Sequence, residues 1–294
     1  MSFFRAMAGL VLVASGAFSR ARLVAQGPLS AASRPPAKST GLHPLVDIEA
    51  NYLMGAYAGG KWLNGKTVAP QLHGQETYRL YSLTRQLGSG QGSQPESFDA
   101  PCPDTYMVKF PPASDRATSG RATFALAAPW NALPRVPQVL NNRLAIYRQA
   151  VRQVLRQHGL SHSPVQIQQI LRVDLDGDGT PEVLISATRY YHYPHSAAPH
   201  AITPDARAGD YSFVLMRKVV AGKVHTTLLE GEFYPTAKKF NAPNEFTLKG
   251  VLDVDGDGKM EVLVSGRYYE GDETTIYRAQ GDKMQAVLNE GCGA

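Results

Sequence analysis

The chain contains one acidic, glycine-laced string twice: DLDGDGTPE at residues 174–182 and DVDGDGKME at residues 253–261. Each copy runs directly into an apolar stretch, VLI after the first and VLV after the second. Two chance copies of so unusual a string are improbable. The repeat therefore indicates one chemistry, metal binding, that the chain uses twice.

Each nonamer belongs to a longer repeat. Apolar, β-branched runs separated by turn-forming residues surround each acidic loop, a pattern typical of short strands. The runs lie at 165–173, 182–191, 211–220 and 224–233 in the first copy, and at 246–252, 261–269, 274–279 and 284–288 in the second. Each copy predicts a four-stranded antiparallel meander with the acidic loop between its first two strands. The first copy carries an insertion at 192–210.

The acidic loops offer oxygen atoms spaced for a hard divalent cation. Ca²⁺ takes six to eight oxygens at about 2.3–2.6 Å, and glycine permits the backbone dihedrals that turn alternate carboxylates inward. Asp occupies positions 1, 3 and 5 of each loop, a backbone carbonyl falls at position 7, and Glu occupies position 9. These positions are Asp174, Asp176, Asp178, Thr180 and Glu182 in the first loop, and Asp253, Asp255, Asp257, Lys259 and Glu261 in the second.

An EF-hand is excluded because it requires a carboxylate at position 12 and flanking helices. Those positions hold Ile185 and Val264, and the flanks read as strands. A metal-free turn is the remaining alternative, since Asp and Gly suit turns. Three carboxylates within five residues repel one another without a cation, however, and the pattern occurs twice. We therefore expect two Ca²⁺ sites with a structural role.

The loops resemble the calcium loops of FG-GAP or VCBS repeats, found between the first two strands of blades in integrin-alpha-like propellers. The resemblance covers about residues 165–289. It implies Ca²⁺ binding, extracellular life and carboxylate ligands at Asp174, Asp176, Asp178 and Glu182, and at Asp253, Asp255, Asp257 and Glu261. The chain departs from the family in ending each loop with Glu rather than Asp, and in lacking the Gly-Ala-Pro that often closes the motif. Two clear copies are also too few for a closed propeller, which usually has at least four blades.

The region before the repeats predicts more β-structure and one amphipathic helix. Strand-like runs at 52–57, 76–83, 104–110 and 122–128 are compatible with a third, diverged sheet. The segment GSGQGSQPES at 88–97 predicts a flexible surface loop. Apolar residues at helical spacing predict a helix over 142–158, capped by Asn141 or Asn142 and ended by Gly159. Its arginines at 148, 152 and 156 predict a solvated face.

The first 46 residues explain the net charge of +5. They hold five basic residues and no acidic one, so residues 47–294 are neutral and do not favour a nucleic-acid partner. The apolar run after Arg5 has the length of a signal-peptide core, followed by small residues suited to cleavage. An uncleaved anchor and an organelle transit peptide are the alternatives. No later run has the roughly 18 apolar residues of a membrane helix.

Cys102 and Cys292 are the chain's two cysteines. In an oxidising compartment they can pair, and a disulfide closing so long a loop adds about 4–5 kcal/mol in the chain-entropy model. Two unpaired thiols are the alternative. The signal-like leader favours the disulfide.

Other candidate chemistry is weaker. His192, His195 and His200 lie in the 192–210 insertion without tight metal-ligand spacing. The chain has no G-x-S-x-G elbow, HExxH helix or Walker loop. Tyrosines at 190, 191, 268 and 269 could stack on sugars, although aromatics that cover a sheet edge explain them better.

The sequence thus predicts a mainly β protein: two four-stranded antiparallel, blade-like repeats, a diverged N-terminal β region and one helix. The expected segments are a signal peptide (1–17), a disordered leader (18–46), the N-terminal β region (47–135), the helix (136–160) and the repeats (161–294, about 165–233 and 246–289). We expect a periplasmic or extracellular, non-catalytic module that binds a protein or glycan partner. The alternatives are an extracytoplasmic hydrolase acting on a glycan or phosphoester, with structural calcium, and an envelope protein whose calcium only maintains the fold.

Overall fold

The computed structural model describes residues 41–111, 122–190, 202–281 and 283–293. They belong to one unit, Pro35–Ala294. The expected signal peptide, the segment 18–40 and the three histidines of the insertion lie outside the described residues. Among the described helices, none has the length and hydropathy to cross a membrane.

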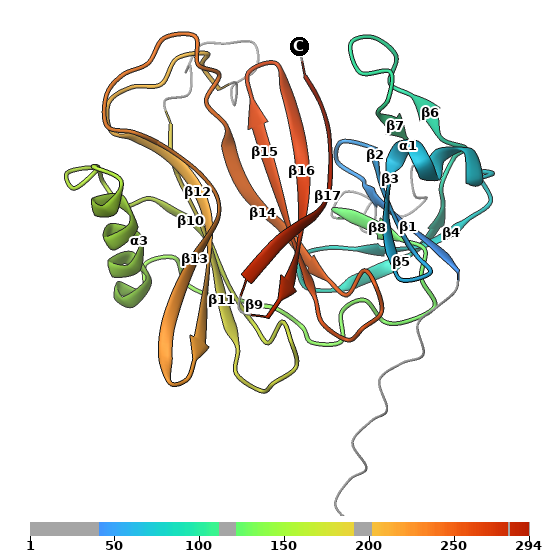
Figure 1. The fold of residues 1–294 in the computed structure, drawn as a ribbon, viewed down its shortest axis with the longest axis horizontal. Helices are drawn as coiled ribbons and strands as arrows, with labels where there is room; N and C mark the ends of the chain where they lie inside the picture. Colours follow the sequence, from blue (N-terminus) through green and yellow to red (C-terminus); the bar gives the residue numbers. More distant parts are fainter. Residues whose placement is uncertain (1–40, 112–121, 191–201, 282, 294) are drawn as a thin grey trace, which may run out of the picture. The chain divides into compact units, whose positions relative to one another are not determined.

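The second repeat forms a four-stranded antiparallel meander, the repeat-two sheet, drawn in orange to red in Figure 1. Its strands follow one another in chain order and pair with their sequence neighbours. They are β14 (Glu245–Leu252), β15 (Glu261–Tyr268), β16 (Gly271–Gln280) and β17 (Lys283–Gly293). The predicted meander is confirmed.

The first repeat forms the repeat-one sheet with the same order and one added strand. The short β9 (Gln138–Val139) pairs with β10 at the edge. The meander strands are β10 (Ile167–Val173), β11 (Glu182–Arg189), β12 (Asp210–Val220) and β13 (Lys223–Tyr234). Both meanders are open sheets, and a closed barrel is not formed in the described part of the chain.

Helix α3 (Ala145–Gln157) covers one face of the repeat-one sheet. Its buried residues Val151, Val154 and Leu155 pack with Tyr211 and Phe213 of β12. The predicted helix begins three residues late because Leu144 has non-helical backbone angles, and the Asn141 side chain instead accepts from the Arg143 amide in the preceding turn. Gly159, with φ of +77°, follows the helix as predicted.

The N-terminal sheet consists of eight of the described strands, in the order β5-β4-β8-β1-β2-β7-β6 with β3 paired to β2. Its strands are β1 (Leu42–Asp47), β2 (Tyr52–Ala58), β3 (Lys61–Asn64), β4 (Thr77–Tyr81), β5 (Gln86–Gln91), β6 (Glu96–Ser97), β7 (Tyr106–Met107) and β8 (Phe124–Leu126). Two short helical turns, α1 (Gly65–Val68) and η1 (Ala69–Gln71), follow β3. This sheet replaces the third blade that the strand-like runs suggested: its order is not that of a meander.

Two expectations about this region were wrong. The segment 88–97 is not one flexible loop, because Gln86–Gln91 pairs with β4 and Glu96–Ser97 pairs with β7. Glycine serves close packing there: a Cβ on Gly92 would lie 2.6 Å from the Val108 side chain. The disordered leader also cannot extend to residue 46, because β1 begins at Leu42 and buries Leu45 and Val46 completely.

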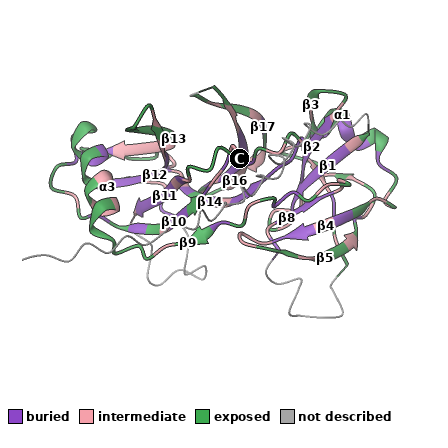
Figure 2. Cartoon of the chain, turned by 90° about the horizontal axis from the view of Figure 1, so that it is seen from below, coloured by how far each residue is buried: buried purple, intermediate pink, exposed green. Residues whose placement is uncertain are grey.

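One hydrophobic core joins the three sheets. It contains Leu45 and Met54 from the N-terminal sheet, Leu184 from β11 and Val262 and Ile276 from the repeat-two sheet. Figure 2 shows buried positions running through β11, β12 and β14, whereas the residues of β13 before Tyr234 are exposed or intermediate. The disulfide between Cys102 and Cys292, with Cα atoms 5.8 Å apart, adds a covalent link between the N-terminal half and β17. The predicted pairing is confirmed.

Candidate metal centres

The two acidic loops have the same internal hydrogen bonds. In the first loop, one carboxylate oxygen of Asp174 accepts from the Gly177 amide (2.8 Å) and the other from the Gly179 amide (3.1 Å). Asp253 accepts from Gly256 and Gly258 at the same two distances. All four glycines have positive φ, between +73° and +88°, where residues with a Cβ are strained. The glycine positions are therefore what allows the loops to fold around their first Asp.

The glutamate after each loop reaches back into it from the start of the following strand. Glu182 Oε2 accepts from the Leu175 amide, and Glu261 Oε2 accepts from the Val254 amide, both at 2.8 Å. Both side chains are almost completely buried, with 1% exposure each. The second oxygen of each glutamate accepts no hydrogen bond from the residues that the structure describes.

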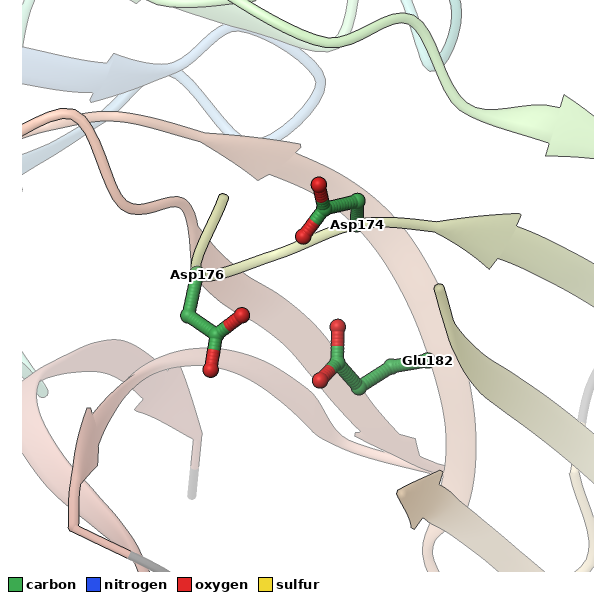
Figure 3. A group of neighbouring side chains, drawn as sticks. All are labelled: Asp174, Asp176 and Glu182. Atoms are coloured by element: carbon green, nitrogen blue, oxygen red, sulfur yellow. The ribbon is translucent and has the colours of Figure 1, made fainter. Parts of the chain in front are cut away.

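These interactions gather three carboxylates in each loop. Asp174, Asp176 and Glu182 each offer an oxygen, and these oxygens lie within 4.8 Å of one another. Figure 3 shows the three side chains pointing toward a common centre. Asp253, Asp255 and Glu261 form the equivalent group in the second loop. Each group could hold a metal ion, and its all-oxygen donor set fits a hard cation such as Ca²⁺ or Mg²⁺.

The second group is the more deeply buried. Asp253, Asp255 and Glu261 are all at most 4% exposed. Burial, and then repulsion from Asp255, raises the pKa of Asp253 to about 7. Burial, and then repulsion from the neighbouring Asp257 carboxylate, raises the pKa of Asp255. Burial also raises the pKa of Glu261 well above its ordinary value. This site therefore disfavours its own negative charge unless a cation is present.

One basic side chain from the third strand of each meander contacts the carboxylates. Lys218 Nζ on β12 lies 2.5 Å from Asp176 Oδ2 and 3.3 Å from Glu182 Oε1. Burial acts to raise the pKa of Asp176, but Lys218 outweighs it and the pKa is lowered. Arg278 on β16 lies 3.0 Å from Asp255 Oδ2 and 4.0 Å from Glu261 Oε1. These contacts are ion pairs by distance, although neither Glu182 Oε1 nor Asp255 Oδ2 is aligned for a hydrogen bond.

The two loops are also tied directly to each other. The Met260 amide of the second loop donates to the Leu175 carbonyl of the first (2.8 Å). The half-buried Arg135 guanidinium donates to the carbonyls of Asp174 and Leu175 in one loop and of Gly258 in the other. Trp130 supports the second loop by donating from its indole nitrogen to the Asp253 carbonyl (2.8 Å).

The remaining predicted ligands lie outside the two groups of three. Asp178 and Asp257 accept from the amides of Thr180 and Lys259, at 2.6 and 2.8 Å, which closes the turn at position 7. Asp257 also pairs with Arg278 at 2.8 Å. Metal ligation by these four residues stays a prediction.

Sequence reasoning missed Lys218, Arg278 and Arg135. The first two had a detectable signal, because each is the basic residue at the same place in the third strand of its meander. In the first meander, Val183 follows the loop glutamate and pairs with Arg217, the residue before Lys218. In the second, Val262 follows the loop glutamate and pairs with Tyr277, the residue before Arg278. Arg135 lies outside the repeats, and nothing in the sequence connected it to the loops.

The tyrosines at the ends of the second strands differ in their surroundings. The Tyr190 ring lies 6.4 Å from that of Tyr234, and Tyr268 packs edge-on against Tyr269 at 5.9 Å. Tyr269 is 43% exposed. Tyr191 lies outside the described residues.

Comparison with known proteins finds no family model that matches the chain, and no curated protein or solved structure that is similar to it.

Proposed function

We propose that this chain is an exported, calcium-stabilised β-repeat protein that acts as a non-catalytic binding module. Each acidic loop would bind one Ca²⁺, held by Asp174, Asp176 and Glu182 in the first repeat and by Asp253, Asp255 and Glu261 in the second. The cations would hold both loops in one conformation, and these loops contact each other and Arg135.

The observation that carries the proposal is a set of buried carboxylate oxygens that lack a hydrogen bond. Glu182 Oε1, Asp255 Oδ2 and Glu261 Oε1 are buried within the carboxylate groups, and none accepts a hydrogen bond from the described residues. Lys218 or Arg278 pairs with these oxygens at 3.0 to 4.0 Å, but one positive charge does not balance three carboxylates, and uncompensated buried charge costs several kcal/mol. A divalent cation at the centre of each group would satisfy these oxygens together and remove the repulsion among the carboxylates.

Two further features support the proposal. The loops connect the first and second strands of four-stranded antiparallel meanders, the place that the FG-GAP or VCBS motif occupies in the proteins that have it. The Cys102–Cys292 disulfide is compatible with an oxidising compartment, where free calcium is sufficient for sites of modest affinity.

The test is thermal unfolding of the full-length chain in excess Ca²⁺, in excess Mg²⁺ and in chelator. At ten times the dissociation constant, each site stabilises the protein by about 1.4 kcal/mol, which raises Tm by about 3–5 °C for a chain of this size. Asp176→Asn and Asp255→Asn should each remove part of that rise. Asp104→Asn, at an exposed residue that pairs with Lys66 away from both loops, is the matched control and should retain all of it. Identical unfolding curves in calcium and chelator, without binding heat by calorimetry, would refute the proposal.

A second candidate, an extracytoplasmic hydrolase, is favoured by one observation. A cavity joins the carboxyl groups of Asp47 and Glu49 from the N-terminal half with those of Glu245 and Asp272 from the repeat-two sheet. Burial raises the pKa of Asp47, as expected for a general acid. Incubation with oligosaccharides and phosphodiesters, followed by assay of new reducing ends and released alcohol, distinguishes the two candidates. If the parent chain hydrolyses a substrate and Asp47→Asn does not, the hydrolase becomes the better proposal and the non-catalytic binding module is rejected.

A further inference from the structure

A cavity of about 560 Å³ lies where the three sheets meet, away from the acidic loops. The repeat-two sheet supplies its floor through β14, β15 and β16. The N-terminal sheet supplies Asp47, at the end of β1, and Thr123, just before β8, and the repeat-one sheet contributes Gln169 of β10. The cavity is large enough for a ligand of two or three sugar rings, since small-molecule sites are typically about 300–1,000 Å³.

The floor of this cavity is polar, although it is a sheet face next to another sheet. Two cross-strand rows run over β14, β15 and β16: Thr247, Ser265 and Thr274 in one, and Glu245, Arg267 and Asp272 in the other. The intervening β14 residues Phe246 and Leu248 are buried in the core on the opposite face. A face meant only for packing would be apolar, so the two rows indicate a space that holds water or a polar ligand.

Hydrogen bonds hold the carboxylates of the cavity in fixed positions. Asp47, 1% exposed, accepts from the amides of Glu49 (3.0 Å) and Ala50 (3.3 Å) and from the Thr274 hydroxyl (2.8 Å). Asp272 accepts from the Tyr52 hydroxyl (2.7 Å). The Lys249 ammonium pairs with Glu49. A ligand would therefore meet acceptors that are already oriented, which lowers the entropic cost of binding.

An aromatic recess adjoins the polar cavity. A second cavity, of about 480 Å³, shares Arg267 and Asp272 with the first and is lined by Tyr52, Phe98, Tyr268 and Tyr269. The apolar face of a pyranose ring can pack on such rings, and their π-systems attract cations. The pair of cavities thus offers hydroxyls and carboxylates at one end and aromatic surface at the other.

The charges of the polar cavity favour a positively charged ligand. Four carboxyl side chains line it, from Asp47, Glu49, Glu245 and Asp272, against two basic side chains, from Lys249 and Arg267. A cleft lined mainly by one sign of charge concentrates ligands of the opposite sign. Carboxylate oxygens also accept hydrogen bonds from hydroxyl groups and, more strongly, from ammonium groups.

We propose that the polar cavity and the aromatic recess together bind an oligosaccharide that carries free amino groups. The carboxylates would pair with its ammonium groups, the hydroxyls of Thr247 and Ser265 would bond to its ring hydroxyls, and the recess would receive an outer sugar ring. A basic peptide would use the carboxylates but would make less use of these two hydroxyls. This inference rests on the proposed binding role but not on calcium, because none of the loop carboxylates lines either cavity.

The test is calorimetric titration of the full-length chain with a β-1,4-linked glucosamine trisaccharide. The comparison ligands are its fully N-acetylated form, a neutral glucose trisaccharide and triarginine. Binding of the glucosamine trisaccharide should be at least tenfold tighter than binding of the other three. It should also weaken as salt is raised, because the carboxylate–ammonium pairs are screened.

Two variants connect the binding to the cavity. Asp272→Asn and Glu245→Gln should each weaken binding of the glucosamine trisaccharide about tenfold, the loss expected for one charge-assisted hydrogen bond. Glu96→Gln, at an exposed residue of β6 paired with Lys109, is the matched control and should bind like the parent chain. Because Glu245 is half-buried and its ion pair with Arg267 is as long as 3.9 Å, Glu245→Gln keeps the test valid if Asp272→Asn fails to fold.

Three results would overturn the inference: no binding of the glucosamine trisaccharide at millimolar concentration, equal binding in both variants and the parent chain, or equally tight binding of triarginine. Each variant is also unfolded thermally in Ca²⁺ and in chelator. If the calcium-dependent rise in Tm is unchanged but the trisaccharide does not bind, the proposed oligosaccharide site is refuted and the calcium proposal stands.

Discussion

Lys218 of the first repeat and Arg278 of the second occupy equivalent positions, and each places a positive charge against the carboxylates of its own acidic loop. Lys218 Nζ lies 2.5 Å from Asp176, and Arg278 lies 2.8 Å from Asp257. The fold thus supplies one built-in cation for each group of three carboxylates. A side-chain cation supplies one charge where a divalent ion supplies two, so these residues and calcium act on the same repulsion.

Replacing these basic side chains should separate their effect from that of the metal. Lys218→Met and Arg278→Met each remove a positive charge within 4 Å of a ligand carboxylate. Calcium should bind the altered loop about tenfold more tightly, because about 1.4 kcal/mol of electrostatic opposition is lost at a partly exposed position. In chelator the same variants should unfold at lower urea concentration, since the carboxylates then repel one another unopposed. Calorimetry and urea titration measure the two effects.

The control for this pair is Lys109→Met, which removes an exposed surface pair with Glu96 and should change neither quantity by more than about 0.5 kcal/mol. If calcium affinity falls in Lys218→Met and Arg278→Met, the basic residues help to assemble the sites and the competition described above is wrong.

The stability of the metal-free protein should fall as pH rises from about 4 to 7. The folded-state pKa of Asp253 is about 7, above the ordinary value of 3.8, and the pKa values of Asp255 and Glu261 are raised in the same direction. An acid whose pKa is raised on folding stabilises the fold while protonated, and this contribution is lost as pH rises through the folded-state pKa. For Asp253 alone the difference corresponds to about 4 kcal/mol.

Calcium should remove the part of this loss that comes from the loop carboxylates, because the cation favours their ionised forms. Burial also raises the pKa values of Asp47, Glu230 and Glu290, which lie away from the loops and account for the part that remains. Urea unfolding between pH 4 and 7.5, with chelator or with excess Ca²⁺, measures both curves. Asp176, whose pKa is lowered, acts below about pH 4 and does not interfere in this window. If the protein in chelator is equally stable at pH 4 and pH 7, ionisation of the second group does not destabilise the fold, and the prediction is wrong.

Most of the repeat architecture could be predicted from the sequence. All eight meander strands appear within a few residues of the expected positions, because alternating apolar residues between Gly-rich turns specify both strand and register. The N-terminal sheet could not be predicted in the same way. Its order joins strands far apart in the chain, and β6, β7 and β8 are only two or three residues long. Such short strands are fixed by their neighbours, and local sequence carries little signal for them.

The acidic groups were only partly predictable. The spacing identified the six carboxylates that the fold gathers into two groups of three. Asp178 and Asp257, also predicted as ligands, lie outside these groups and accept backbone amides within their own turns, so their ligation stays a prediction. The polar cavity could not be foreseen, since it combines Asp47 with Asp272 across more than two hundred residues.

Arg135 lies outside the repeats and is only half-buried, but we expect it to contribute strongly to the free energy of unfolding. Its guanidinium bonds to carbonyls of both loops, so Arg135→Ala should lower the free energy of unfolding by about 2–3 kcal/mol. Arg135→Lys retains the charge but not the fork of donors, and should recover less than half of that loss. Urea unfolding in excess Ca²⁺ measures both variants. A lysine variant as stable as the parent chain would mean that charge alone, and not the bridge between the loops, is what Arg135 provides.

The glycines of the second loop should respond unequally to alanine. Gly258 has φ of +84° and no atom within 4 Å of an added Cβ, so Gly258→Ala carries only backbone strain, about 1–2 kcal/mol. Gly256 has φ of +73°, and its Cβ would lie 3.0 Å from ring atoms of Trp130. Gly256→Ala should therefore cost about 1 kcal/mol more, because the indole must shift and strain its hydrogen bond to the Asp253 carbonyl.

This shift should also reach the metal group, since Asp253 is one of its three carboxylates. Calcium affinity at the second loop should fall in Gly256→Ala and stay near the parent value in Gly258→Ala, while the first loop is unchanged in both. Calorimetry in an Asp176→Asn background isolates the second loop for this comparison. Equal calcium affinities in the two alanine variants would show that Trp130 does not hold the Asp253 backbone in its binding position.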